Sequence, residues 1–314
     1  MPLDPRVRRF LDLLAATNPP SASSLTVAQR RTAVGHLMAF AGPPAAVARV
    51  DDGTVPGPGG AVPVRTYTPE GAPAGLLPGM VYFHGGGLVA GSLDTHDTIA
   101  RSLAAATGCR TVSVGYRLSP EAPFPAALED ACAAVDYVAA HAAEFGIDPA
   151  RLGVAGDSAG ATLAAAACQR RAASGAPALR LQLLLCPILD YAGRSASRVE
   201  LASGYLVDEA TLEHDLRHYL AAGGAAEDPR VSPLRSPALG ALPPALIHAA
   251  EYDPLRDEAA EYARRLTAAG GSARYTCHAG MIHLFYGLAG VIPYARSAWA
   301  QIGAEVHAAL AGGA

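Results

Sequence analysis

Short apolar runs alternate with longer, alanine-rich amphipathic segments along most of this chain, and this alternation restricts its fold more than any other feature. Apolar runs of about four to eight residues are typical of buried strands, and a period of about 3.6 residues is typical of helices. The predicted strands are residues 62–67, 80–83, 111–116, 152–155, 181–185, 245–249 and 273–277. The predicted helices are residues 96–106, 125–145, 159–173, 257–269 and 293–311. This order predicts an α/β fold whose mainly parallel central sheet is flanked by helices.

Two segments depart from the alternation. Residues 1–45 are helical in pattern, and residues 188–231 interrupt the strand-helix rhythm between two apolar strands. Open α/β sheets bind their ligands at the carboxyl ends of the strands. We therefore expect residues 1–45 and 188–231 to form a helical cap over that edge, and residues 46–187 and 232–314 to form the catalytic domain.

The charged residues exclude several classes of protein. All 24 residues counted as Lys+Arg are arginine, so chemistry that needs a lysine, such as Schiff-base or P-loop chemistry, is excluded. The net charge of −4 argues against nucleic acid as a partner. The five cysteines are widely spaced and form no C-x-x-C pair, so neither a disulfide framework nor a zinc site is predicted. We expect no metal and no cofactor.

No membrane segment is predicted. Residues 1–10 contain arginines but no apolar run behind them, so no secretory signal is expected and the default compartment is the cytoplasm. Residues 71–93 and 275–295 carry no Asp, Glu or Arg, but glycines and histidines interrupt both, so we expect no stable membrane insertion. These two stretches indicate uncharged loops around a buried site.

The sharpest motif is Gly156-Asp157-Ser158-Ala159-Gly160, which follows an apolar strand and precedes an alanine-rich helix. A G-x-S-x-G motif in this setting is typical of a strained strand-to-helix turn that exposes a nucleophilic serine. The N–H of Ala159, at the start of the helix, would then face a developing oxyanion.

A second motif, His84-Gly85-Gly86-Gly87, follows the strand 80–83. Glycines there allow backbone N–H groups to approach a bound carbonyl oxygen, and the pairing of HGGG with a later G-x-S-x-G is typical of an esterase oxyanion hole. His84 precedes the serine in the chain, whereas the base of this fold follows it, so we interpret His84 as a structural residue of the loop.

A serine hydroxyl needs a histidine to accept its proton and a carboxylate to orient that histidine. Asp253 follows the apolar strand 245–249, whereas its rivals Asp257 and Glu258 fall where they would cap the next helix. His283 lies in a loop after the last predicted strand, and its competitor His278 lies closer to that strand. Chain order and loop position favour Asp253 and His283.

Together these motifs resemble the bacterial hormone-sensitive-lipase-like carboxylesterases, from about residue 62 to the C-terminus. The matching segments are 82–87 (YFHGGG), 91–97 (GSLDTHD), 116–121 (YRLSPE), 124–130 (FPAALED), 156–160 (GDSAG), 253–258 (DPLRDE) and 280–283 (GMIH). The resemblance implies an α/β-hydrolase fold with Ser158 as nucleophile, Asp253 and His283 as its partners, and the N–H groups of Gly85, Gly86 and Ala159 as oxyanion hole. It also suggests a homodimer formed through residues 273–277.

Two departures from the family pattern bear on the substrate. Leu88 stands where an aromatic residue often follows HGGG, and Leu284 replaces a small residue after the histidine. We expect both to shape the substrate pocket. Neutral drift with compensating packing is the alternative.

The sequence thus predicts a serine esterase that hydrolyses small or short-chain acyl esters through an acyl-enzyme, with activity falling below about pH 6–7 because the base must be neutral. An amidase, a lactonase or a deacetylase on the same triad remains open. A non-catalytic small-molecule binder on the same fold is the other alternative.

Overall fold

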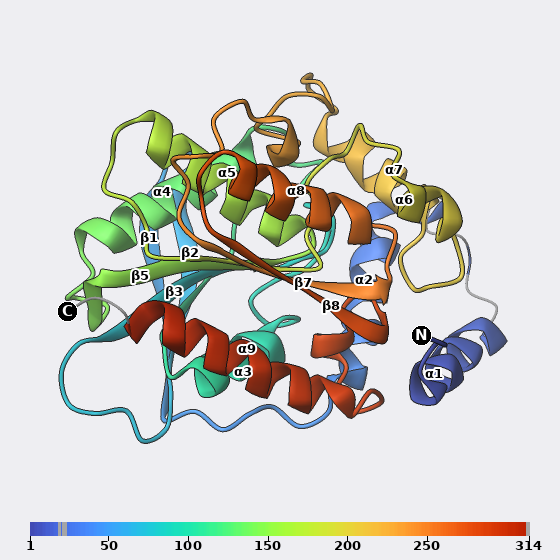
Figure 1. Ribbon diagram of the computed structural model, residues 1–314, viewed down its shortest axis with the longest axis horizontal. Helices are drawn as coiled ribbons and strands as arrows, with labels where there is room; N and C mark the ends of the chain where they lie inside the picture. Colours follow the sequence, from blue (N-terminus) through green and yellow to red (C-terminus); the bar gives the residue numbers. More distant parts are fainter. Residues whose placement is uncertain (18–19, 21–23, 312–314) are drawn as a thin grey trace.

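The computed structural model describes residues 1–17, 20 and 24–311, and its described residues form one eight-stranded sheet covered by helices on both faces (Figure 1). The order of the strands across the sheet is β1-β2-β4-β3-β5-β6-β7-β8. The strands are β1 (Arg49–Gly57), β2 (Gly60–Thr68), β3 (Leu77–Phe83), β4 (Arg110–Val114), β5 (Ile147–Asp157), β6 (Gln182–Leu185), β7 (Ala245–Tyr252) and β8 (Ala273–Ile282).

Six neighbouring strands, from β4 to β8, run parallel to one another, as predicted. Parallel strands with helices on both faces are buried on both sides, which explains the nearly unbroken burial of β3, β6 and β7. The edge strand β8 is partly exposed. Their carboxyl ends meet at one edge of the sheet, and the segments after β3, β5, β7 and β8 therefore converge there. The candidate site is built from these segments.

Sequence patterns did not predict β1. It pairs antiparallel with β2 across a tight turn in which Gly57 faces Gly60. In the segment RVDDGTVPG only Val55 is buried, so the strand has no apolar run and no apolar alternation that could mark it as a strand. At the opposite edge of the sheet lies β8, where the predicted homodimer contact falls; that contact stays a prediction.

The helices form one layer on each face of the sheet (Figure 1). On one face lie α3 (Asp97–Thr107) and α9 (Tyr294–Ala311), and on the other lie α4 (Ala126–Ala140), α5 (Ala159–Ala173) and α8 (Arg256–Ala268). The predicted helix 125–145 is too long, because residues 141–146 form turns that lead into β5. None of the helices in the described parts of the chain is long and apolar enough to span a bilayer.

The two segments that interrupt the alternation both contain helices, and residues 1–45 were expected to do so from their pattern. Residues 1–45 contain α1 (Pro5–Ala16), α2 (Val27–Met38) and the short 3-10 helix η2 (Ala39–Ala41). Residues 188–231 contain α6 (Ala196–Glu200) and α7 (Glu209–Tyr219). Two further 3-10 helices, η3 (Pro233–Arg235) and η4 (Phe285–Gly287), lie in connections of the α/β part.

Candidate active site

Ser158 occupies the turn between β5 and α5 with φ 53° and ψ −121°, a conformation that side-chain-bearing residues rarely adopt. Strain of this kind persists only where the surroundings enforce it, and it concentrates at functional sites. Here the Ser158 N–H donates to the Leu185 carbonyl oxygen at 2.8 Å. A Cβ added at Gly160 would lie 2.0 Å from the Phe83 oxygen, so the turn needs a glycine there. The predicted strand-turn-helix context of Ser158 is present.

His283 and Asp253 are hydrogen-bonded to each other. The distance from His283 Nδ1 to Asp253 Oδ2 is 2.8 Å, and both side chains are buried. The Leu255 N–H donates to the other carboxylate oxygen of Asp253 at 2.9 Å. These residues lie in the segments that follow β7 and β8, so the parallel sheet brings together two positions 30 residues apart.

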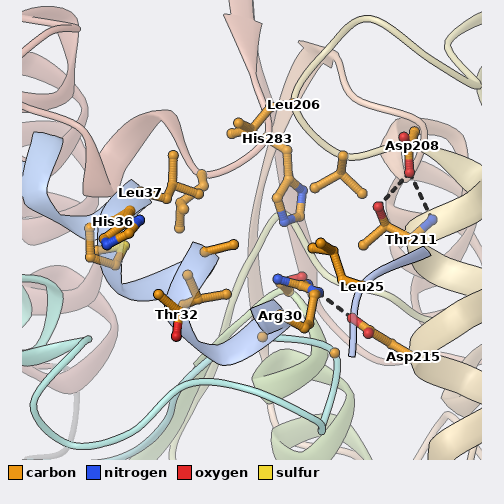
Figure 2. A pocket seen from close by; sticks show the side chains of 18 of the residues that line it. Leu25, Arg30, Thr32, His36, Leu37, Leu206, Asp208, Thr211, Asp215 and His283 are labelled. Atoms are coloured by element: carbon orange, nitrogen blue, oxygen red, sulfur yellow. Dashed lines mark hydrogen bonds and ion pairs between the residues drawn. The ribbon is translucent and has the colours of Figure 1, made fainter. Parts of the chain in front are cut away.

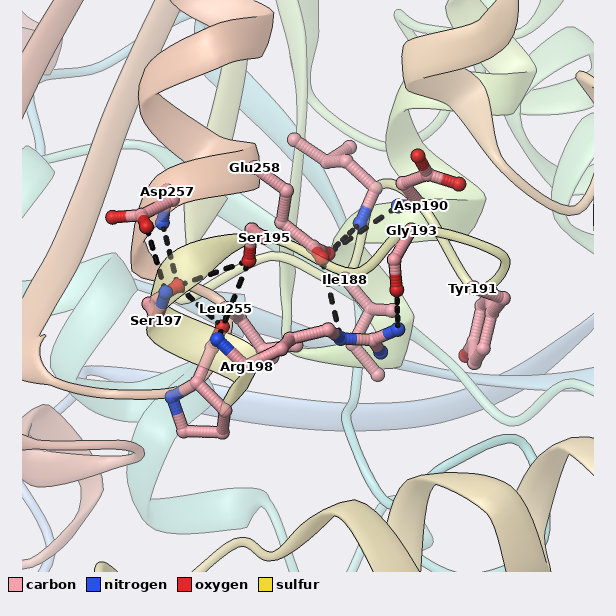
Figure 3. Close-up of polar contacts among 12 residues, drawn as sticks. Ile188, Asp190, Tyr191, Gly193, Ser195, Ser197, Arg198, Leu255, Asp257 and Glu258 are labelled. Atoms are coloured by element: carbon pink, nitrogen blue, oxygen red, sulfur yellow. Dashed lines mark hydrogen bonds and ion pairs between the residues drawn. The ribbon is translucent and has the colours of Figure 1, made fainter. Parts of the chain in front are cut away.

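The rival residues make other contacts. Asp257 accepts from the Ser197 N–H at 2.8 Å, and Glu258 accepts from the Leu189 N–H at 2.7 Å, so both carboxylates bind the segment after β6 (Figure 3). His278 is hydrogen-bonded to His248 at 3.0 Å. None of these hydrogen bonds joins Asp257, Glu258 or His278 to Ser158 or His283.

A cavity of about 740 Å³ connects Ser158 and His283. Its wall includes Gly86 and Gly87 of the glycine loop as well as Leu284, and helical segments complete it. The helical residues come from α1, α2 and η2 and from the stretch 206–215, which includes the start of α7 (Figure 2). Both segments that interrupt the sheet pattern therefore line the cavity onto which Ser158 opens.

The glycine loop differs from the expectation at Gly85. Its N–H donates to Asp157 Oδ1 at 3.0 Å, and the Tyr82 hydroxyl donates to the same oxygen at 2.5 Å. Burial raises the pKa of Asp157, and these two donors oppose that rise. The Gly85 N–H is thus occupied by a buried carboxylate, which sequence patterns could not reveal. The backbone of Gly86 and Gly87, in contrast, borders the cavity.

His84 is a structural residue of this loop, as predicted. Its Nδ1 lies 2.8 Å from the Gly85 carbonyl oxygen, and the Tyr116 hydroxyl donates to the His84 carbonyl oxygen at 2.6 Å. Burial lowers the pKa of His84 to about 3, so its ring is neutral at ordinary pH. The ring stacks on Tyr116, which fixes the loop beside Ser158.

The two expected pocket residues differ in position. Leu284 lines the cavity directly after His283, with φ 62°. Leu88 is fully buried in the hydrophobic cluster that contains Val81 and Phe83, and it is absent from the described residues that line the cavity. The expectation for Leu88 is therefore wrong in this structure, because its side chain points into the core and not into the cavity.

Cys186 adds a thiol next to the paired residues. One ligand atom each of Cys186, Asp253 and His283 lies within 4.8 Å of the others, a group that could in principle hold a metal ion. The imidazole nitrogen and the carboxylate already bind each other, however, so a metal would have to displace that hydrogen bond. The arrangement favours proton transfer over metal binding.

A serine on a strained strand-to-helix turn, within a mainly parallel eight-stranded sheet, is the architecture of an α/β hydrolase. The sequence model of the family described as alpha/beta hydrolase fold matches residues 80–287, and the chain belongs to this family. The resemblance to hormone-sensitive-lipase-like carboxylesterases is confirmed, and the family and its relatives place the chain among carboxylic ester hydrolases.

Three relatives illustrate the likeness. The chain is 40% identical over 245 residues to the carboxylic ester hydrolase LipN of Mycobacterium tuberculosis, a match that covers 76% of this chain and 65% of LipN, just under two thirds of that protein. It is 39% identical to an ethyl acetate hydrolase of Pseudomonas putida, with 74% of each chain covered. The solved ester-hydrolase EH1AB1 from the metagenome of Lake Arreo is 39% identical, with a TM-score of 0.94 and 98% of each chain covered.

Proposed function

We propose that this protein is a serine carboxylesterase in which Ser158, His283 and Asp253 form the catalytic triad. The observation that carries the proposal is the 2.8 Å hydrogen bond between His283 and Asp253 at the wall of the same cavity onto which the strained Ser158 turn opens. In this assignment Asp253 holds the imidazole with its Nδ1 protonated, which leaves Nε2 free to accept the serine proton.

The reaction proceeds in two stages. Ser158 Oγ attacks the ester carbonyl carbon while His283 takes the hydroxyl proton, and the imidazolium then gives that proton to the leaving alcohol. A water molecule next attacks the acyl-enzyme with His283 as base and releases the acid. The tetrahedral oxyanion of each stage is stabilised by backbone N–H groups.

The donors we assign to the oxyanion are the N–H groups of Gly86, Gly87 and Ala159. Gly86 and Gly87 border the cavity, and Ala159 is the first residue of α5, where helix N–H groups have no partner within the helix. Gly85 is replaced by Gly87 in this assignment, because Asp157 accepts the Gly85 N–H.

Small or short-chain acyl esters are the substrates we propose. Residues 1–45 and 188–231 act as a cap that bounds the cavity, and most of the lining side chains from these segments are apolar or small. A bounded cavity limits the length of the acyl chain that fits. The P. putida relative is named for the hydrolysis of ethyl acetate, a short-chain ester, and this supports the choice.

The direct test is covalent labelling by an alkyl phosphonate probe, followed by hydrolysis assays. We expect the wild-type protein to be labelled at Ser158 and to hydrolyse p-nitrophenyl acetate, and Ser158→Ala to lose both by at least about 1000-fold. Absence of labelling in the wild type would contradict the proposal and support the non-catalytic binder.

A panel of p-nitrophenyl esters from acetate to palmitate, with matched anilides and lactones, separates the esterase from the other activities. We expect hydrolysis to fall with chain length beyond the short acyl groups, and the anilides and lactones to react more slowly than the esters. Faster turnover of an amide or a lactone would reassign the reaction to an amidase or a lactonase on the same residues.

A further inference from the structure

An ion pair crosses the cavity between the two segments that bound it. Arg30 on α2 donates from Nη2 to Asp215 Oδ2 on α7 at 2.9 Å, and the exposed fractions of these side chains are 15% and 4%. Both residues line the cavity together with Ser158 and His283. Figure 2 shows the Arg30 guanidinium between His283 and Asp215.

The carboxylate of Asp215 lies directly against the glycine loop. A Cβ added at Gly87 would lie 1.9 Å from Asp215 Oδ2 and 2.5 Å from its Cγ. The other carboxylate oxygen lies 3.1 Å from Nδ1 of His214, its neighbour on α7. A negatively charged group is therefore in van der Waals contact with the backbone to which we assign the stabilisation of the oxyanion.

This position is unfavourable for catalysis unless the charge is compensated. Negative charge develops on the substrate oxygen in the transition state, and an unpaired carboxylate a few ångströms away repels it, most strongly in a site shielded from water. The guanidinium of Arg30 cancels this repulsion, because it pairs with Asp215 from the side of the cavity.

We propose that Arg30 is a positioning residue for ester hydrolysis: it neutralises Asp215 beside the glycine loop and so removes the repulsion between that carboxylate and the oxyanion. The inference rests on the proposed function, since it assumes that Gly86 and Gly87 face an oxyanion. It also explains why α2 supplies a charged side chain to an otherwise mostly apolar wall.

The test compares Arg30→Met, Asp215→Asn and the double variant on p-nitrophenyl acetate, with wild type and Ser158→Ala measured alongside. We expect Arg30→Met, which keeps the carboxylate but loses its cation, to lower kcat about 10-fold with little change in KM. Asp215→Asn and the double variant carry no carboxylate, so we expect both to stay within about 3-fold of wild type.

Arg31→Met is the matched control for the anchoring of α2. Arg31 lies on the same helix and fastens it to the catalytic part, through Glu121 at 2.6 Å and the Val89 carbonyl oxygen at 2.9 Å, but it does not line the cavity in the described residues. We expect a smaller loss of kcat in Arg31→Met than in Arg30→Met.

Three outcomes would overturn the inference. If the kcat of the double variant falls as much as that of Arg30→Met, the ion pair serves to hold α2 against α7 and does not act through its charge. An unchanged kcat in Arg30→Met would show that Arg30 does not support the chemical step, and recognition of an anionic substrate would then be its remaining role. A wild type without Ser158-dependent hydrolysis would remove the proposed function and this inference together, whereas the first two outcomes leave the proposed function intact.

Discussion

Asp253 lies at the centre of the proposed triad, with one carboxylate oxygen bonded to His283 and the other to the Leu255 N–H. Asp253→Asn keeps the shape of the side chain, but its amide favours the wrong tautomer of the histidine. We expect kcat to fall about 1000-fold or more, as for similar changes in other serine hydrolases. The initial-rate kinetics of p-nitrophenyl acetate hydrolysis measure this loss.

The control for Asp253→Asn is Asp257→Asn, four residues along the same loop and helix start. Asp257 accepts hydrogen bonds from Ser197 and Arg256, away from His283, so we expect its variant to keep kcat within about 3-fold. Equal losses in the two variants would show that the segment 253–258 matters as a whole, and the assignment of Asp253 would then fail.

Leu284 is the residue at which we expect a change of substrate preference. It lines the cavity next to His283 in a left-handed conformation, so Leu284→Gly enlarges the cavity and removes backbone strain at the same position. We predict that the preferred p-nitrophenyl ester shifts toward longer acyl chains, by about a 5-fold change in the ratio of kcat/KM for octanoate over acetate.

Leu88→Phe is the companion variant with the opposite expectation. Leu88 is fully buried among core side chains, so a larger ring overpacks the core and lowers the free energy of unfolding by about 1–3 kcal/mol. Urea unfolding measures this loss. If Leu88→Phe changes the acyl preference and keeps the stability of the wild type, Leu88 would instead be a residue that shapes the substrate pocket.

At the scale of elements, α6 is fastened to α8 by a buried charge cluster (Figure 3). Arg198 Nε lies 3.6 Å from Glu258 Oε2 and 3.8 Å from Glu209 Oε2, and Arg198 Nη1 donates to the Gly193 carbonyl oxygen. Burial raises the pKa of Glu258 to about 8, although Arg198 and the N–H groups of Leu189 and Asp190 oppose the rise. The cluster ties the segment after β6 to the helix that begins beside Asp253.

Removal of Arg198 tests how much this connection stabilises the fold. Arg198→Met leaves the buried carboxylate of Glu258 without a cation, whereas Glu209 still pairs with Arg194 at 3.7 Å. An uncompensated buried charge costs about 3–5 kcal/mol. Because Glu258 takes up a proton readily, we expect the lower part of that range, about 3 kcal/mol in the free energy of unfolding by urea. Arg194→Met removes pairs with Glu209 and Glu213 that a largely exposed side chain makes, so it should cost less than about 0.5 kcal/mol. If both variants lose the same free energy of unfolding, the buried cluster does not stabilise the fold more than an exposed ion pair does.

The elements that sequence patterns predicted well are those whose burial is uniform. The parallel strands β3, β6 and β7 are almost entirely buried. Asp253 and His283 could be chosen because loops after parallel strands converge at one edge. β1 escaped prediction because a single side chain of it is buried. The role expected for the Gly85 N–H was wrong because its partner, Asp157, is distant in sequence. The place expected for the Leu88 side chain was wrong because its direction depends on core residues that are also distant in sequence.

At the scale of the whole molecule, two pairs of buried histidines lie apart from each other, one after the central strand β3 and one on β7 and β8 near the edge of the sheet. His84 and His96 lie beside the glycine loop, and His248 and His278 lie on β7 and β8, hydrogen-bonded to each other at 3.0 Å. Burial is the largest cause that lowers the pKa of each ring, to about 3 for His84 and to about 4 for the other three. In the unfolded chain these rings take up a proton near pH 6.5.

The sign of the resulting pH dependence follows from these depressed pKa values. Below about pH 6.5 the unfolded chain binds protons that the folded state does not, so stability is complete above that pH and is lost as the pH falls toward about 4. Each ring contributes a slope of up to about 1.4 kcal/mol per pH unit, which amounts to about 2 kcal/mol between pH 6.5 and pH 5. Glu258 acts in the opposite direction, since its pKa is raised.

A single variant isolates one histidine from this sum. His278→Gln keeps a hydrogen-bonding side chain between His248 and Tyr294 but removes the titrating ring, so its free energy of unfolding should fall less steeply between pH 6.5 and pH 5, by about 1–2 kcal/mol relative to wild type. His307→Gln, an exposed position on α9, is the matched control and should leave the slope unchanged. Because both variants carry the same substitution, a difference between their slopes in urea unfolding reports the buried ring alone. Parallel slopes for wild type and His278→Gln would mean that His278 accepts a proton in the folded state, and the histidine pair would then not limit stability in acid.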